Sequence, residues 1–206
     1  MHDRRIDGQV RVFGNAGALF MNAMTWFDHE TESIWSQPWG RAIKGELKGT
    51  ELFVLPSRVI TWGDWQAEHP ETLVMMNDVG RLSFRQEFDP GFVIGLLLDG
   101  RARAYYYTNV AEKTIINDMF DEFPILLWAA DNNYQAYLRR VDGRTLTFRW
   151  EDGQLTDEET GSTWDVRSGL ALAGPLRGQS LQPIPGSTAY DWAWEDFYPD
   201  TTFYEK

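Results

Sequence analysis

The chain has 206 residues, nineteen Lys and Arg against thirty-one Asp and Glu, a net charge of −12, and no cysteine. This charge argues against binding to nucleic acid or to an anionic membrane surface, because both need a basic face, and the absence of cysteine excludes disulfides, thiolate metal sites and cysteine nucleophiles. The longest apolar runs are too short to span a bilayer and the N-terminus has no signal-peptide pattern, so we expect a soluble protein without membrane insertion, in a compartment that the sequence does not identify.

Turn signals divide the chain into short strands. Asp-Gly pairs begin at Asp7, Asp99, Asp142 and Asp152, and this dipeptide readily takes the positive φ angles of a two-residue hairpin turn. The predicted elements, in chain order, are a helix at 62–68, a hairpin of strands 92–98 and 101–107, a helical turn at 110–113, a hairpin of strands 125–130 and 135–139, strands 144–150, 154–158 and 162–166, and a helix at 191–197. The pattern predicts a mainly β fold with a few short helices.

The chain contains an internal repeat. Residues 28–72 align with residues 157–201 at a constant offset of 129, with fifteen identities in forty-five positions and no gap. Upstream, residues 4–8 (RRIDG) match residues 139–143 (RRVDG) at an offset of 135, so the first copy carries 135 − 129 = 6 extra residues between Phe13 and Phe27. We interpret this as a duplication that produces two pseudo-symmetric β-rich lobes.

The repeat also predicts how the chain is organised. We expect a first lobe at 1–77, a bridging hairpin and short helix at 78–121, and a second lobe at 122–206, with the lobes packed as one unit because no flexible linker separates them. Glu32 stands where the second copy has Gly161. Because a positive φ is costly for glutamate, we predict that the first copy has a rebuilt turn there.

Several separated blocks resemble the prokaryotic family catalogued as domain of unknown function 3179, and the resemblance covers nearly the whole chain. The matching motifs share their spacing as well as their residues: Phe13-Gly14 with Gly17 and Asn22, the run Asp28-x-x-Thr31-x-Ser33-x-Trp35-Ser36-Gln37, Gly45, Leu47, Gly49, the run Trp62-x-x-Trp65-x-x-x-His69-Pro70-x-Thr72, Asn117-Asp118, and residues 157–164. Members of this family commonly carry a Cys-Pro-x-Cys segment before the position of Arg4, which this chain lacks. The resemblance implies no activity.

Differences between the two copies select the candidate site residues, because identical residues most economically serve the shared fold. His29 stands opposite Glu158, His69 opposite Tyr198, and Ser36-Gln37 opposite Asp165-Val166. The candidate catalytic residues are Asp28, His29, Glu30 and His69. The candidate ligand-binding residues are Asn22, Ser36 and Gln37. A surface histidine beside carboxylates is the alternative for His29, and a helix-end residue is the alternative for His69.

These candidates do not assemble into a recognised catalytic set. Successive strand residues face opposite sides, so Asp28 and Glu30 can converge but His29 cannot join them, and we predict no metal site. The sequence identifies no cofactor. We therefore hypothesise a non-catalytic ligand-binding or interaction module, with a small-molecule or protein partner and with oligomers allowed. The alternatives are a metal-dependent or hydrolase-like enzyme with its site in the first lobe, and a structural partner domain; whether the chain is an enzyme is left open.

Overall fold

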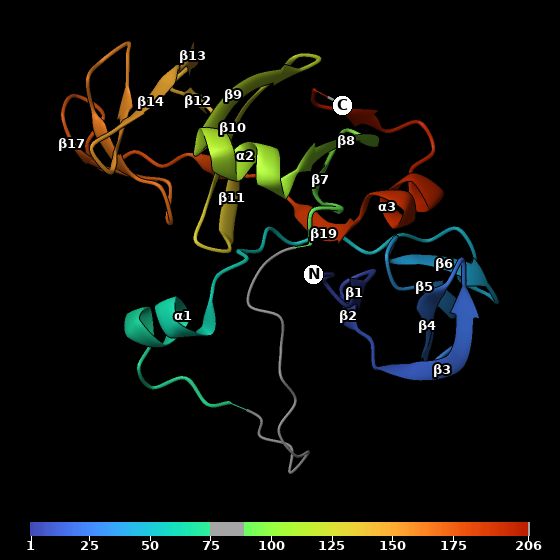
Figure 1. Ribbon diagram of the computed structural model, residues 1–206. Coiled ribbons are helices and arrows are strands. Elements are labelled where there is room, and N and C mark those ends of the chain that lie inside the picture. Colours follow the sequence, from blue (N-terminus) through green and yellow to red (C-terminus); the bar gives the residue numbers. More distant parts are fainter. Residues whose placement is uncertain (75–88, 206) are drawn as a thin grey trace. The chain divides into compact units, whose positions relative to one another are not determined.

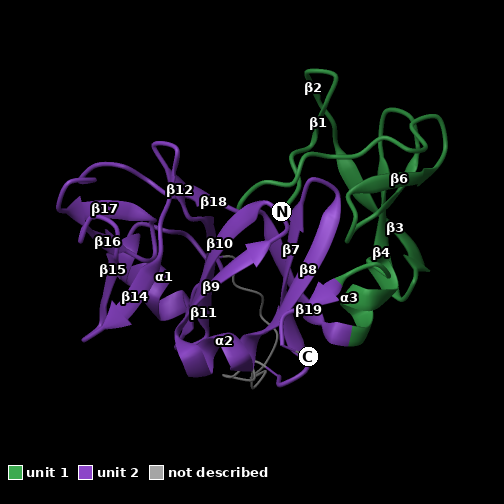
Figure 2. Ribbon diagram, turned by 90° about the horizontal axis from the view of Figure 1, so that it is seen from above, with its two compact units in different colours: residues 1–57, 192–201 green, residues 58–191, 202–206 purple. Residues whose placement is uncertain are grey.

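The computed structural model describes residues 1–74 and 89–205, and the expected fold class is confirmed: the chain is mainly β with three short helices (Figure 1). Residues 78–88 of the predicted bridging segment lie outside the described residues. The chain forms two compact units, one of residues 1–57 with 192–201 and one of residues 58–191 with 202–206 (Figure 2). Among the described residues, no helix has the length and apolar character needed to cross a bilayer.

Unit 1 contains a two-stranded sheet, β1-β2, and a four-stranded antiparallel sheet in the order β3-β4-β5-β6. These strands are β1 (Arg5–Ile6), β2 (Gln9–Val10), β3 (Phe13–Phe20), β4 (Ala23–Asp28), β5 (Ile34–Ser36) and β6 (Arg41–Lys44). The cross-strand neighbours Trp26, Trp35 and Ala42 share the inner face of the larger sheet, since paired residues of antiparallel strands point to the same side. Ile6 and Leu52 complete the core on that face.

Unit 2 contains the other four sheets, in the orders β12-β13, β14-β15-β16-β17, β18-β11-β10-β9 and β19-β7-β8-β20. All their pairings are antiparallel except that of β20 with β8. These strands are β7 (Phe92–Leu98), β8 (Arg101–Tyr106), β9 (Ile115–Phe120), β10 (Phe123–Ala130), β11 (Asn133–Leu138), β12 (Arg140–Val141), β13 (Arg144–Thr145), β14 (Phe148–Glu151), β15 (Gln154–Asp157), β16 (Thr163–Asp165), β17 (Leu170–Ala173), β18 (Gln182–Pro183), β19 (Gly186–Tyr190) and β20 (Thr202–Phe203).

Strand β10 lies between two hydrophobic cores of unit 2. Ile125 and Leu127 point into the larger core with residues of β7, β8 and β11, whereas Leu126 and Trp128 point into the core over β14–β17. A strand that is buried on both faces needs apolar residues at every position, which explains the uninterrupted apolar run of β10.

The predicted Asp-Gly turns are confirmed. Asp and Gly have positive φ in all four pairs, so each pair closes a hairpin with the twist that antiparallel strands need. The single strand expected at 144–150 is instead two strands, β13 and β14, in different sheets. The chain changes sheets at the fully buried Leu146, whose backbone N–H bonds to the carbonyl of Arg139.

Three helices connect or follow the sheets: α1 (Trp62–Glu68), α2 (Tyr107–Lys113) and α3 (Asp191–Phe197). The bounds of α1 and α3 are the predicted ones, and α2 extends the predicted turn at 110–113 by three residues. Thr61 caps α1 by accepting a hydrogen bond from the N–H of Asp64.

The helices at equivalent positions of the repeat belong to opposite units. α1 follows the first repeat's sheet but lies in unit 2, where Asp64 and Glu68 pair with Arg167 of the β16–β17 turn at 3.1 and 3.2 Å. Residues 192–197 of α3 follow the second repeat's sheet but lie in unit 1, where the indole N–H of Trp39 in the β5–β6 turn donates to the carbonyl of Phe197 at 2.9 Å. Figure 2 shows this exchange by the colour of α3.

Candidate functional site

Asp28, the last residue of β4, is the hub of a buried hydrogen-bond network. Its carboxylate accepts the indole N–H of Trp35 at 2.9 Å, the backbone N–H of Thr31 at 2.7 Å, and the hydroxyl of Thr31 at 2.8 and 2.9 Å. Asp28 has no exposed surface. Burial alone would raise the pKa of Asp28, but the hydrogen bonds from Trp35 and Thr31 outweigh it and hold this pKa below its usual value.

The second repeat forms the same network around Asp157. That carboxylate accepts the indole N–H of Trp164 at 2.9 Å, the N–H of Thr160 at 2.6 Å and the hydroxyl of Thr160 at 2.8 and 3.0 Å. Both networks extend through a serine: Ser33 accepts a backbone N–H from the loop after β6, and Ser162 accepts one from the loop after β17. Because both repeats form the same bonds, we interpret Asp28 as a structural residue that stabilises the loop after β4.

The predicted rebuilt turn at Glu32 is wrong. Glu32 has a φ of 55°, and its counterpart Gly161 has a φ of 69°. In both repeats the N–H of this residue bonds to the carbonyl of the hub aspartate, at 2.9 and 3.0 Å. The hub network keeps the same loop geometry, so Glu32 adopts a left-handed conformation that glycine takes at less cost.

Glu30 and His29 point to different surroundings. A side-chain oxygen of Glu30 accepts the backbone N–H of Val12 at 3.3 Å, and Glu159 does the same for Thr147 at 2.8 Å. The exposed imidazole of His29 stacks on Phe27, with ring centroids 4.9 Å apart. Within residues 1–74 and 89–205, no three His, Asp or Glu side chains lie close enough together to hold a metal ion.

The candidate ligand-binding residues surround the extended β3–β4 hairpin. Asn22 lies in its turn with a φ of 59°, and the backbone N–H of Gln37 bonds to the carbonyl of Met24. Ser36 is 1% exposed, and its hydroxyl has no hydrogen-bond partner among the described residues. In the second repeat Asp165 accepts the N–H of Arg167; the first repeat has Pro38 there, which has no N–H to donate.

His69 is the C-cap of α1. Its backbone N–H bonds to the carbonyl of Trp65 at 2.8 Å, and its ring lies 4.2 Å from the ring of Trp65. The nearest acid is its neighbour Glu68, with a ring nitrogen to oxygen distance of 4.0 Å. His69 belongs to unit 2 and the other catalytic candidates to unit 1, so neither unit by itself contains the whole predicted set.

The outer face of the first repeat's sheet carries an aromatic platform, formed by Gly14, Phe27 and His29. Gly14 pairs with Phe27 across β3 and β4, so the two lie on the same face. A Cβ at Gly14 would lie 2.6 Å from the Phe27 ring and 3.2 Å from the His29 ring, so the ring of Phe27 lies directly over the glycine backbone. The platform is exposed at His29 and half-buried at Phe27.

The second repeat has a polar surface at the same positions. Arg149, Thr156 and Glu158 occupy the places of Gly14, Phe27 and His29, since Arg149 pairs with Thr156 in the register that Gly14 has with Phe27. Arg149 and Glu158 form an exposed ion pair at 3.4 Å. The two repeats therefore share an inner face but differ completely at this part of the outer face.

The difference continues across the outer face. Next to the platform, Ile34 replaces Thr163, and on the edge strand Arg41 and Lys44 replace Leu170 and Ala173. In the second repeat the charged residues of this face lie beside β14, whereas in the first repeat they lie on β6. The result is an apolar ring surface bordered by two exposed cations.

The fold and these sites define a mainly β protein with a repeated hairpin loop, and its described residues contain no group of His, Asp and Glu side chains that could hold a metal ion. The sequence model of the family described as Protein of unknown function (DUF3179) matches residues 1–90 and residues 85–201. The chain belongs to this family. Neither the curated proteins nor the solved structures contain a match to the chain.

The platform residues Gly14 and Phe27 were not among the sequence candidates. Aligning Gly14 with Arg149 requires knowing where the six extra residues lie, and the sequence places them only between Phe13 and Phe27. Strand pairing supplies the missing register, because it puts the irregularity between Asn15 and Leu19. Gly14 and Phe27 lie on opposite sides of the six extra residues, so a comparison of the two repeats can identify the platform only once the strand register is known.

Proposed function

We propose that the chain is a non-catalytic ligand-binding protein whose ligand lies on the aromatic platform of the first repeat. The observation that carries this proposal is the replacement of an ion pair, Arg149 with Glu158, by stacked rings on an otherwise shared sheet. A glycine beneath Phe27 removes the side chain that would separate the ring from the sheet. Aromatic faces of this kind bind other rings by stacking, worth about 0.5–1.5 kcal/mol beyond the area they bury.

The bordering cations add little preference for a charged ligand, because Arg41 already lies 3.6 Å from a carboxylate oxygen of Glu51. Arg41 and Lys44 lie on the edge strand of the same face, and Ile34 provides an apolar surface between them and Phe27. No residue between Phe13 and Phe27 is charged, so the platform adds no acid of its own from this segment. The proposed ligand is a small molecule with a planar ring.

The enzyme alternative has less support. It relied on Asp28, His29, Glu30 and His69, but the carboxylates of Asp28 and Glu30 form the same loop bonds as their counterparts in the second repeat. A thermal-shift screen with divalent metal ions tests this alternative directly. A stabilising shift that is lost in His69→Ala would favour the enzyme.

The test of the proposed function transplants one repeat's surface onto the other. The triple variant Gly14→Arg, Phe27→Thr and His29→Glu gives the first repeat the residues that the second repeat carries on the same scaffold. Ligand-observed NMR with indole, adenosine and phenyl glucoside measures binding to the native protein and to the variant. We expect a ring compound to bind the native protein and not the triple variant.

Ile34→Thr is the matched control, because it also installs a second-repeat residue on this face but leaves the platform intact. It should retain part of the binding. If every compound that binds the native protein binds the folded triple variant equally well, the platform is not the site.

A further inference from the structure

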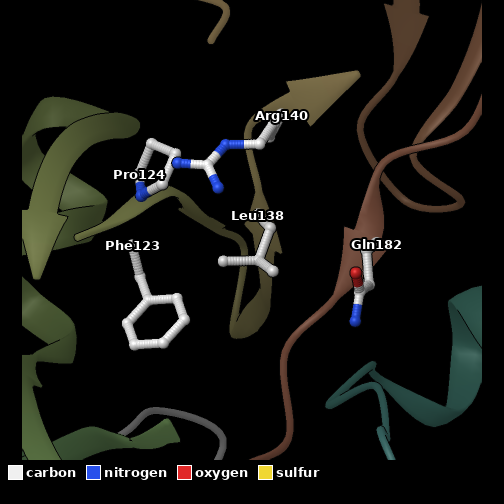
Figure 3. Close-up of a pocket in the computed structure, with 5 residues that line it drawn as sticks. All are labelled: Phe123, Pro124, Leu138, Arg140 and Gln182. Atoms are coloured by element: carbon white, nitrogen blue, oxygen red, sulfur yellow. The ribbon is translucent and has the colours of Figure 1, made fainter. Parts of the chain in front are cut away.

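A hollow in unit 2 lies at the open end of the β10–β11 hairpin. It has a volume of about 190 Å³. The residues that line it are Phe123, Pro124, Leu138, Arg140 and Gln182 (Figure 3). We call it the Arg140 pocket.

The floor of the Arg140 pocket is the edge of the main core. Phe123 and Leu138 are half-buried and pack against the core cluster that includes Ile125 and Leu127. Pro124 is buried beside them. The floor is therefore apolar and is supported by a buried hydrophobic core of unit 2.

The rim of the pocket is polar and carries a cation. In Figure 3 the guanidinium of Arg140 points toward Pro124, and the amide of Gln182 lies on the other side of Leu138. One guanidinium nitrogen donates to the backbone carbonyl of Glu122 at 3.3 Å. Of the carboxylates in the described part of the chain, none is within 4.0 Å of the Arg140 guanidinium.

The first repeat gives this arginine a different partner. Arg5 is the counterpart of Arg140, and its guanidinium nitrogen donates to both carboxylate oxygens of Asp3, at 3.0 and 2.9 Å. The counterpart of Asp3 in the second repeat is Leu138. Leu138 in place of an aspartate therefore leaves Arg140 without that carboxylate partner and provides the apolar wall.

We propose that the Arg140 pocket binds a small aromatic monocarboxylate, with the ring on Leu138 and Phe123 and the carboxylate on Arg140. The ligand carboxylate takes the place that Asp3 has at Arg5, and planar guanidinium groups bind carboxylates through two parallel hydrogen bonds. A dry cavity of about 150 Å³ accommodates benzene, so the pocket has room for one ring of that size. The amide of Gln182 supplies a further donor at the rim.

The probe is benzoate, titrated into the native protein and followed by chemical-shift changes in amide NMR spectra. A ligand of this size is expected to bind with a dissociation constant of about 1 mM. Benzamide keeps the ring without the charge, and acetate keeps the charge without the ring. Both should bind at least about tenfold more weakly, since each loses one of the two contacts.

Arg140→Gln should weaken benzoate binding about tenfold or more, because it removes the charge-assisted pair. Arg144→Gln is the matched control: it removes one positive charge from the same β12–β13 hairpin at an exposed residue that does not line the pocket. Binding in this control should be unchanged. Leu138→Asp recreates the pair of Asp3 with Arg5 and should abolish binding.

Three results would overturn the proposal: benzoate does not saturate, Arg140→Gln binds it like the native protein, or Arg144→Gln weakens it equally. Circular dichroism checks that each variant is folded, and if Leu138→Asp is not, the two arginine variants decide. The platform triple variant should still bind benzoate, so this result is independent of the proposed function.

Discussion

Replacing Asp28 by Asn tests whether the shared hydrogen-bond network holds the fold. Asparagine fits the space but offers one acceptor oxygen in place of two and turns an N–H₂ group toward Thr31 or toward the indole N–H of Trp35. At least one buried donor then lacks an acceptor, which costs about 1–3 kcal/mol, in addition to the loss of charge on the remaining bonds. We expect Asp28→Asn to lower the free energy of unfolding by about 2–4 kcal/mol.

The repeat provides a second measurement of the same quantity. Asp157→Asn breaks an equivalent network and should lower the free energy of unfolding by a similar amount. Urea unfolding, followed by far-ultraviolet circular dichroism, measures both variants. Asp152→Asn is the control, because Asp152 is exposed at a positive-φ turn position that asparagine tolerates, and it should change stability by less than about 0.5 kcal/mol. A loss below about 1 kcal/mol in Asp28→Asn would refute the structural role of the network.

Two further predictions concern strain and pH. Glu32→Gly should raise the free energy of unfolding by about 0.5–1 kcal/mol, because only glycine takes this positive φ without strain. For the same reason Gly161→Glu should lower it by a similar amount. A lower urea midpoint for Glu32→Gly would contradict this prediction. Burial, followed by the nearby N-terminal charge, lowers the pKa of His2 from its ordinary value of 6.5. As the pH falls below 6.5, the unfolded chain therefore takes up a proton before the folded chain does. The free energy of unfolding then decreases until the pH has passed the lowered pKa of the folded chain. His2→Phe should remove this part of the pH dependence and the exposed-residue control His69→Gln should not; equal pH profiles for native protein and His2→Phe would count against burial of His2 as the cause.

Local signals explain why much of the fold could be predicted from the sequence. The Asp-Gly turns place hairpins because their φ angles are set by residue type, and Pro70 and Pro199 mark the ends of two helices for the same reason. The division into lobes at 1–77, 78–121 and 122–206 stays a prediction. The exchange of α1 and α3 between units could not be predicted, because it depends on contacts such as Trp39 with Phe197, which are 158 residues apart in sequence.

The candidate sites were less predictable than the fold, since they depend on which residues share a face. The repeat comparison identified His29 as a difference between the copies but could not pair it with Gly14 and Phe27 without strand register. At Glu32 the residue type itself gives the wrong prediction. Its residue type predicts a different turn, yet the hydrogen bonds that Asp28 accepts from the loop hold it in the geometry of the second repeat.

The two proposed sites share one feature: at each of them, one repeat lacks an ion pair that the other repeat has. The second repeat keeps Arg149 with Glu158 where the first has the aromatic platform, and the first keeps Arg5 with Asp3 where the second has the Arg140 pocket. Exposed ion pairs contribute about 0–1 kcal/mol, so losing one costs little stability. Losing the hub network, which both repeats form, would cost several times more. In each repeat an apolar surface therefore lies where the other repeat has a surface ion pair, while the hydrogen-bonded loop is the same in both.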